Sequence, residues 1–259
     1  MFEYLARLGY ASKALVYAVV GVLAILAVSN RGGMVTDTSG ALRVVLTKPL
    51  GRALLIVVAI GLCGYAVWRV LDALLDPDRD GTSFSGLVTR IGNAVRGCIY
   101  GALGLEAIQL LRGLRASNGD AELWTARILE WPSGPVLVGI AGGIVAAYGA
   151  NQVVKSIRGA GDQKVDWSSI SPRMRPFLQK VSRFGVGIRG GVIATLGVFL
   201  VRAALTEQPA QAAGARESML RLGGVFEGRW FLALIAVGVL AYAVDQAIHA
   251  RCRRIHPVV

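Results

Sequence analysis

Six long apolar runs alternate with short polar connections and predict six membrane-spanning helices. A bilayer crossing needs about 20 mostly apolar residues, and such runs lie at roughly 8–29, 50–72, 92–112, 134–154, 185–205 and 229–249. The first, third and fifth runs each carry one basic residue near the start, whose long side chain can reach the headgroups. The pattern therefore predicts an all-α, integral membrane bundle.

One motif occurs three times and divides the chain into similar units. The copies are Arg7-Leu8-Gly9, Lys13-Ala14, Tyr17 and Gly21; Arg90-Ile91-Gly92, Arg96-Gly97, Tyr100 and Gly104; and Arg183-Phe184-Gly185, Arg189-Gly190, Ile193 and Gly197. The even-numbered runs repeat as well, because Tyr65, Tyr148 and Tyr242 occupy matching places and are followed by Asp72, Lys155 and His249. Self-similarity of this length indicates internal duplication, with units over residues 1–80, 81–165 and 166–259.

Each unit is expected to contain two spans and a short amphipathic helix in the outer connection between them. The amphipathic stretches at 40–46, 123–129 and 218–222 each hold one Arg among apolar residues, which is typical of a helix in the interface plane. A two-span unit returns the chain to its starting side, so the three repeats are parallel. Parallel repeats relate by an axis along the membrane normal, which predicts pseudo-threefold symmetry.

Composition and charge agree with a membrane protein. The hydrophobic residues make up 54% of the chain and the charged residues 17%, whereas about a quarter of a soluble domain is charged. A net charge of +12 would also suit a nucleic-acid binder, but the basic residues lie between apolar runs instead of on one soluble face. A positive-inside bias and attraction to anionic lipid explain them better, and we expect no nucleic-acid partner.

The distribution of Lys and Arg predicts the orientation. The side that holds both termini and the connections after the second and fourth spans is the more basic one. Because basic loops stay in the cytoplasm, both termini are predicted to be cytoplasmic, in the bacterial cytoplasmic (inner) membrane.

Three intramembrane cations form the main candidate site. If the bundle has threefold symmetry, Lys13, Arg96 and Arg189 lie at one depth and can converge on an anion, a lipid phosphate or water. An outer ring would be supplied by the basic residue that opens each motif, namely Arg7, Arg90 and Arg183. The alternative, which we favour at this stage, is that all six side chains reach separately to the headgroups as topology anchors.

Other polar residues within the spans are weaker candidates. Glu106 breaks the repeat, and Gln109 at i+3 or Arg112 near the outer interface could satisfy it locally. Asn151 and Asp245, with the glutamine that follows each, could line a polar cavity or bond one another, and we favour the second. Glycines at four-residue spacing in the spans predict close helix–helix packing.

No catalytic constellation is visible in the sequence. No nucleophile lies beside a base and an orienting acid, and the three cysteines and two histidines have no metal-ligand spacing. We therefore expect a protein that is not an enzyme and that has no metal and no cofactor.

The threefold motif resembles the bacterial domain-of-unknown-function 1206 family. The Pro49-Leu50-Gly51-Arg52 segment and the Ser171-Pro172-Arg173 connection are also similar to that family, whereas Ile193 departs from its aromatic preference. The resemblance covers nearly the whole chain and implies a six-span membrane protein of three two-helix repeats. It implies no activity.

Two functions are compatible with these features. The first is a non-catalytic, lipid-associated scaffold or accessory subunit of a larger membrane complex, with anionic membrane lipids and other membrane subunits as partners. The alternative is a channel or transporter for a small solute or anion along the repeat axis. The spans lack the paired proline breaks and rings of acidic residues that many transporters and channels show, which weakens the alternative.

Overall fold

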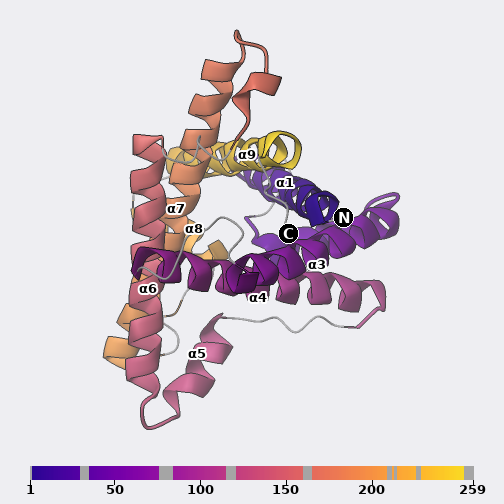
Figure 1. Ribbon diagram of the computed structural model, residues 1–259. Coiled ribbons are helices and arrows are strands. Elements are labelled where there is room, and N and C mark those ends of the chain that lie inside the picture. The colour runs from indigo at the N-terminus through magenta and orange to yellow at the C-terminus, as the bar shows by residue number, and fades with distance from the viewer. Residues whose placement is uncertain are drawn as a thin grey trace.

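The computed structural model describes residues 2–29, 35–75, 84–114, 121–159, 165–208, 212, 215–225 and 229–253, and these ranges contain helices and no β-strand. The long helices are α1 (Phe2–Val28), α3 (Gly51–Leu75), α4 (Phe84–Leu111), α6 (Gly134–Arg158), α7 (Arg175–Thr206) and α9 (Arg229–Cys252). All six are long and apolar enough to cross a membrane. The all-α, multi-pass prediction is therefore confirmed at this level (Figure 1).

The helices extend beyond the apolar runs that predicted them. The fifth run was expected to begin near residue 185, but α7 begins at Arg175 with a proline in its first turn. Proline is favoured there because its missing N–H has no partner within a helix start. The first turns of α7 are polar, so hydropathy alone does not reveal them.

Short helices occupy the three connections within the repeats, between α1 and α3, between α4 and α6, and between α7 and α9. They are α2 (Thr38–Leu46), α5 (Ala121–Leu129) and α8 (Ala215–Val225), and they coincide with the three amphipathic stretches. Asp37 caps α2, because its carboxylate accepts a hydrogen bond from the Gly40 N–H at 2.9 Å. Ala41, Leu42 and Val45 are buried, so α2 is held by its apolar face against the long helices.

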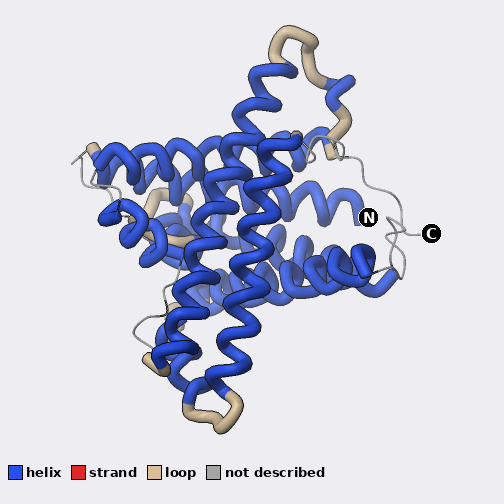
Figure 2. Tube along the Cα trace, turned by 90° about the vertical axis from the view of Figure 1, so that its left-hand side faces the viewer, coloured by secondary structure: helices blue, strands red, loops and turns tan. Residues whose placement is uncertain are grey.

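The long helices pack mainly in three pairs, α1 with α9, α3 with α4, and α6 with α7. In addition, α1 packs against α3 and α7 packs against α9. Figure 1 shows α6 and α7 running together and the α3–α4 pair crossing them, and Figure 2 shows two long helices side by side in the view turned by 90°. The pairs α3–α4, α6–α7 and α9–α1 each join helices of different repeats, so the repeats interlock.

Glycine allows α6 and α7 to approach closely. A Cβ atom on Gly149 would lie 2.3 Å from the Ala194 nitrogen, and one on Gly197 would lie 2.2 Å from the Ala146 nitrogen. Distances this short exclude any side chain at either position. Gly197 of the repeated motif therefore mediates packing as predicted, whereas Gly143 and Gly191, also predicted to do so from their four-residue spacing, would meet no atom within 4 Å.

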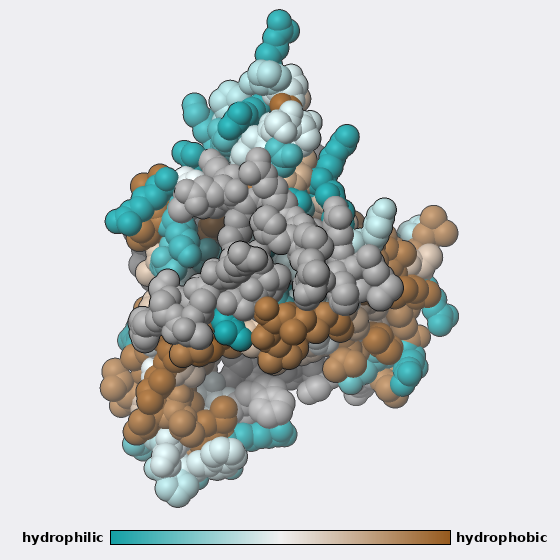
Figure 3. All heavy atoms as spheres, in the orientation of Figure 1, coloured by the Kyte–Doolittle hydropathy of each residue, from teal (hydrophilic) through white to brown (hydrophobic). Residues whose placement is uncertain are grey.

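Large apolar side chains remain on the outside of the bundle. Ile56, Val57 and Ile60 on α3 and Ile140 and Ile144 on α6 are all exposed. Figure 3 shows apolar side chains, in brown, over the lower part of one face and polar ones, in teal, at its top and edges. An apolar outer surface on helices of this length is what a lipid environment stabilises.

Candidate functional site

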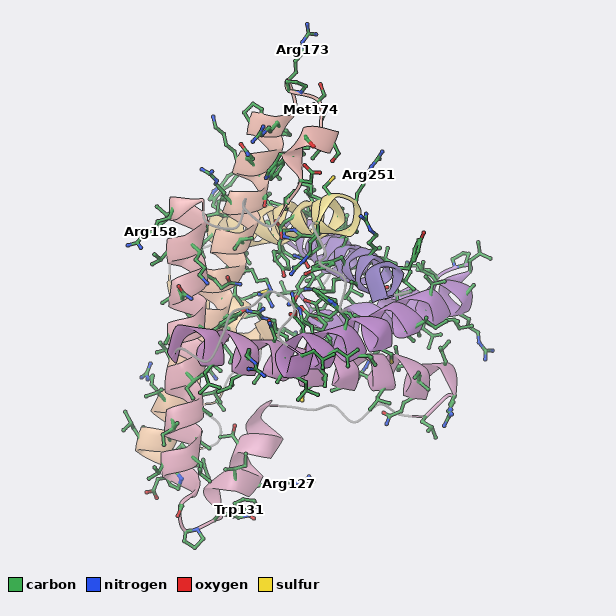
Figure 4. All side chains as sticks on the ribbon, viewed as in Figure 1. Arg127, Trp131, Arg158, Arg173, Met174 and Arg251 are labelled. Carbon is green, nitrogen blue, oxygen red and sulfur yellow. The ribbon has the colours of Figure 1, made fainter. Side chains whose placement is uncertain are left out.

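A cavity of about 280 Å³ lies at the centre of the bundle, a size near the lower end for small-molecule sites. Figure 4 shows side-chain nitrogen and oxygen atoms gathered there, between the helix pairs. The Lys and Arg residues that line the cavity are Lys13, Arg69, Arg96, Lys155, Arg183, Arg189 and Arg253. One Asp, Asp245, also lines it. The cavity wall is therefore strongly cationic.

The three basic residues predicted from the repeat converge on this cavity. Each one lies over the tyrosine of the second long helix in its own repeat. The distances to the ring centroids are 4.5 Å for Lys13 and Tyr65, 5.4 Å for Arg96 and Tyr148, and 4.8 Å for Arg189 and Tyr242. Equivalent positions of the three repeats thus form one cation–π arrangement, which supports each cation by about 0.5–2 kcal/mol.

Lys13 is the most enclosed of these cations, with 4% of its surface exposed. Its ammonium group lies 3.3 Å from the Tyr65 hydroxyl and 4.5 Å from the centroid of the Tyr100 ring. In the part of the chain that the structure describes, no carboxylate lies within salt-bridge distance of Lys13, Arg96 or Arg189. The three cations therefore face the cavity with tyrosines as shared partners, and Arg96 also donates to the Asn93 side-chain oxygen at 2.9 Å.

A fourth cation on this wall, Arg69, has a carboxylate partner. Arg69 donates to Asp72 at 2.9 Å, to Tyr65 at 2.9 Å and to Tyr10 at 3.0 Å. Asp72 also accepts from the Asn93 amide at 2.8 Å. This buried network holds the Tyr65 ring, which the Lys13 ammonium group contacts, and so positions one side of the cavity wall.

The opposite wall is built around Asp245 on α9. Asp245 accepts hydrogen bonds from Ser182 and, at 2.8 Å, from the Gln246 amide, and its backbone carbonyl lies 2.9 Å from His249 Nδ1. The favoured expectation was that these polar residues bond one another, and Asp245 and Gln246 both do so and line the cavity. Asn151 is exposed and does not line it.

Tyrosines close the cavity toward the middle of the bundle. The hydroxyls of Tyr17 and Tyr100 lie 3.5 Å apart, and the Tyr17 ring meets the Tyr242 ring edge-on at 4.8 Å. Val16 and Val20, on the same helix as Tyr17, are fully buried. Tyrosine and valine side chains therefore pack together at this level of the bundle.

The outer ring of arginines lies against helix ends. Arg7 donates to the carbonyls of Ala250 and Arg251 at the end of α9, and Arg90 donates to those of Ala73 and Leu74 at the end of α3. Arg183 lines the cavity, and its guanidinium also lies beside Gly159, which caps α6. A cation at a helix C-terminus is stabilised by the carbonyls that lack intrahelical partners.

Glu106 lies away from the cavity, near the opposite ends of the helices. Ser39 donates to its carboxylate at 2.6 Å, and the Arg43 guanidinium lies 3.7 Å from it. Both partners come from α2 in another repeat, whereas Gln109 and Arg112 had been expected. Glu106 thus ties an outer connection to α4.

Nothing in the described ranges brings three His, Cys, Asp or Glu side chains together as a metal site. Besides Asp245 and His249, the cavity offers mainly cations, phenols and amides, which can donate hydrogen bonds to an anion.

One protein family matches the chain three times. The sequence model described as Domain of Unknown Function (DUF1206) covers residues 8–76, 91–159 and 184–253. The chain belongs to this family. The three matches contain the three copies of the basic-residue motif from its glycine onward, which confirms the resemblance seen in the sequence.

A relative from Bacillus subtilis (strain 168), described as "Uncharacterized protein YxxB", is 30% identical over 238 residues, which is 92% of this chain and 86% of the relative. No solved structure matches the chain.

Sequence reasoning missed several residues of the cavity wall, among them Tyr10, Arg69 and Arg253. Arg69 offered a signal, since it interrupts an apolar run three residues before an aspartate, and residues at i and i+3 of a helix lie within bonding reach. Arg253 bonds Tyr10 across the two ends of the chain, a contact that no local pattern encodes.

Proposed function

We propose that this protein is a non-catalytic integral membrane protein that binds a phosphate-type anion in the cationic cavity. In this proposal it acts as a lipid-associated scaffold or accessory subunit of a membrane complex. The observation that carries the proposal is the convergence of Lys13, Arg96 and Arg189 on one cavity without a carboxylate beside them among the described residues.

The energetic argument concerns the cost of burying like charges. Taking one ion out of water costs several kcal/mol after relaxation. A cation–π contact returns about 0.5–2 kcal/mol, so tyrosines alone do not offset three neighbouring cations. An anion with several acceptor oxygens would satisfy all three through charge-assisted hydrogen bonds. Phosphate has this chemistry, whether it is free or part of a lipid headgroup.

The same proposal includes the orientation and symmetry of the bundle. The cavity would lie on a pseudo-threefold axis in the cytoplasmic leaflet, since equivalent residues of all three repeats line it. Both termini would be cytoplasmic in a bacterial inner membrane, and α2, α5 and α8 would lie in the outer interface. Figure 4 shows Arg158 and Arg173 at one end of the α6–α7 pair, and Trp131 together with Arg127 at the other, so the tryptophan lies at the end proposed to be outside.

The channel or transporter alternative fits less well. The contact between Tyr17 and Tyr100 and the buried valines of α1 pack together at one level of the bundle. A transporter would have to open this contact during each cycle. Reconstituted protein that carried phosphate across vesicles would favour the alternative over a static binding role.

Binding of phosphate-type anions tests the proposal directly. Full-length protein in a neutral detergent is titrated with inorganic phosphate and with dioctanoyl phosphatidylglycerol, and binding is measured by calorimetry or native mass spectrometry. Arg96→Gln should weaken binding about tenfold, because a hydrogen bond to a charged group contributes about 1.5–3 kcal/mol. Arg96 is half-buried, so its replacement disturbs the core less than that of Lys13.

Arg202→Gln is the matched control. Arg202 is an exposed cation on α7 outside the cavity lining, so its loss changes the net charge equally and should leave binding unchanged. If Arg96→Gln and Arg202→Gln lose the same binding affinity, the net charge of the protein and not the cavity determines binding. Wild-type protein that binds neither probe would contradict the proposed function.

The orientation has its own test. A green fluorescent protein fused after Val259 should fluoresce in cells, and alkaline phosphatase at the same place should be inactive, because the fusion stays in the cytoplasm. The opposite pair of results would place the C-terminus outside and contradict the proposed orientation.

A further inference from the structure

One pair of neighbouring helices is not packed together. The long helices contact one another in the order α4, α3, α1, α9, α7 and α6. Contact between α4 and α6 would close this series into a ring, but within the described ranges the two helices have almost no close backbone contact. In the other two repeats the corresponding helices, α1 with α3 and α7 with α9, do pack.

Equivalent glycines show the same difference. A Cβ atom on Gly9 would meet the Tyr65 Cβ at 2.3 Å, and one on Gly185 would meet the Tyr242 nitrogen at 2.2 Å. At Gly92, the added atom would find only the Arg96 side chain, at 3.9 Å. The second repeat therefore keeps the glycine that permits close packing but leaves its surface uncovered by α6.

The cavity wall is more exposed beside this gap than on the side formed by α1, α3 and α9. Lys13, Tyr65 and Tyr242, on the α1, α3 and α9 side, are buried. Arg96 on α4 and Tyr148 on α6 are half-buried, and Lys155 and Arg183, near the ends of α6 and α7, are exposed. The cavity is thus reachable at these helix ends and beside the gap, where α4 and α6 meet through Arg96 and the Tyr148 ring, 5.4 Å apart.

Exposed apolar side chains lie one helical turn from Arg96 on α4 and from Tyr148 on α6. Ile99 follows Arg96 at i+3 and is 53% exposed, and Ile144 precedes Tyr148 at i−4 and is 65% exposed. Residues at these spacings lie on one helix face. Arg96 is six residues, or about 9 Å, from the end of its span at Arg90, so this region is within the membrane.

We infer that the cavity takes the headgroup of an anionic phospholipid, which reaches it sideways between α4 and α6 while its acyl chains lie against Ile99 and Ile144. The inference rests on the proposed anion site and adds the source of the anion. Cations beside exposed apolar side chains are complementary to a phospholipid, because that molecule carries both a phosphate and hydrocarbon tails. A soluble anion would use the cations alone.

A tryptophan placed between α4 and α6 distinguishes an anionic phospholipid from a soluble anion. Ile144→Trp narrows the gap without touching a cation, and Val237→Trp on α9, which is 50% exposed and outside the cavity lining, is the control. Full-length variants in neutral detergent are titrated with dioleoyl phosphatidylglycerol and, separately, with inorganic phosphate. Ile144→Trp should weaken lipid binding by at least about fivefold and leave phosphate binding unchanged, while Val237→Trp should change neither.

If Ile144→Trp does not fold, Ile99→Trp on α4 provides the same test. Retained binding of inorganic phosphate shows that a variant is folded. Lipid binding that survives both tryptophans overturns the lateral route. So does wild-type protein that binds phosphate but not phospholipid, and in both cases the anion site stands. Wild-type protein that binds neither probe overturns the anion site and this inference together.

Discussion

Replacing Asp72 with alanine is expected to lower the free energy of unfolding by about 3–5 kcal/mol. Asp72 and Arg69 form an ion pair at 2.9 Å with 4% and 7% of their side chains exposed. Without the carboxylate, a buried guanidinium would remain among Lys13 and the other cations of the cavity. The loss is measured as a shift of the denaturation midpoint of purified protein in detergent.

Two variants show whether charge pairing causes this loss. Arg69→Met together with Asp72→Leu removes both charges and should restore much of the stability, because a well-packed apolar pair can replace a buried ion pair. Glu217→Gln breaks a partly exposed pair with Arg221 and should cost less than about 1 kcal/mol. A double variant as unstable as Asp72→Ala alone would argue that shape at this position, and not charge, determines stability.

Gly149→Ala is expected to destabilise the protein by about 1–3 kcal/mol, because the new methyl group would overlap the backbone of α7. Gly197→Ala should act in the same way from the other helix. The pair α6–α7 would have to separate to make room. Thermal unfolding followed by fluorescence should show a midpoint several degrees lower than that of the wild type.

Neighbouring glycines supply the control. A Cβ atom on Gly143 or Gly191 would find no atom within 4 Å. Gly143→Ala and Gly191→Ala should therefore be neutral or slightly stabilising, since alanine is the better helix former by up to about 1 kcal/mol. Equal destabilisation at all four positions would mean that glycine is needed for the helices themselves and not for their contact.

The repeat made the central site predictable from sequence. Lys13, Arg96 and Arg189 occupy equivalent places, and duplicated units that pack alike bring equivalent side chains together. The alternative that they extend separately to the headgroups was favoured from sequence, yet all three line one cavity. Snorkelling describes an isolated helix, whereas the tyrosines that hold these cations belong to other helices.

The gap between α4 and α6 was not predictable. Gly92 has the same sequence context as Gly9 and Gly185, so the motif predicts the same close packing in all three repeats. Whether two helices meet depends on the sum of contacts over both surfaces. Here α6 packs closely against α7 and α4 packs closely against α3, and these contacts decide the spacing.

The contact of α1 with α9 sets an order for biosynthesis. Arg7 bonds the last turn of α9, so α1, the earliest of the described helices to be made, has its main partner in α9, the latest of them. While α3 meets α4 and α6 meets α7 soon after they are made, one side of α1 stays without its partner until α9 has been made. A nascent chain that stops before residue 229 would therefore expose that side of α1 to the insertion machinery and to quality-control proteases.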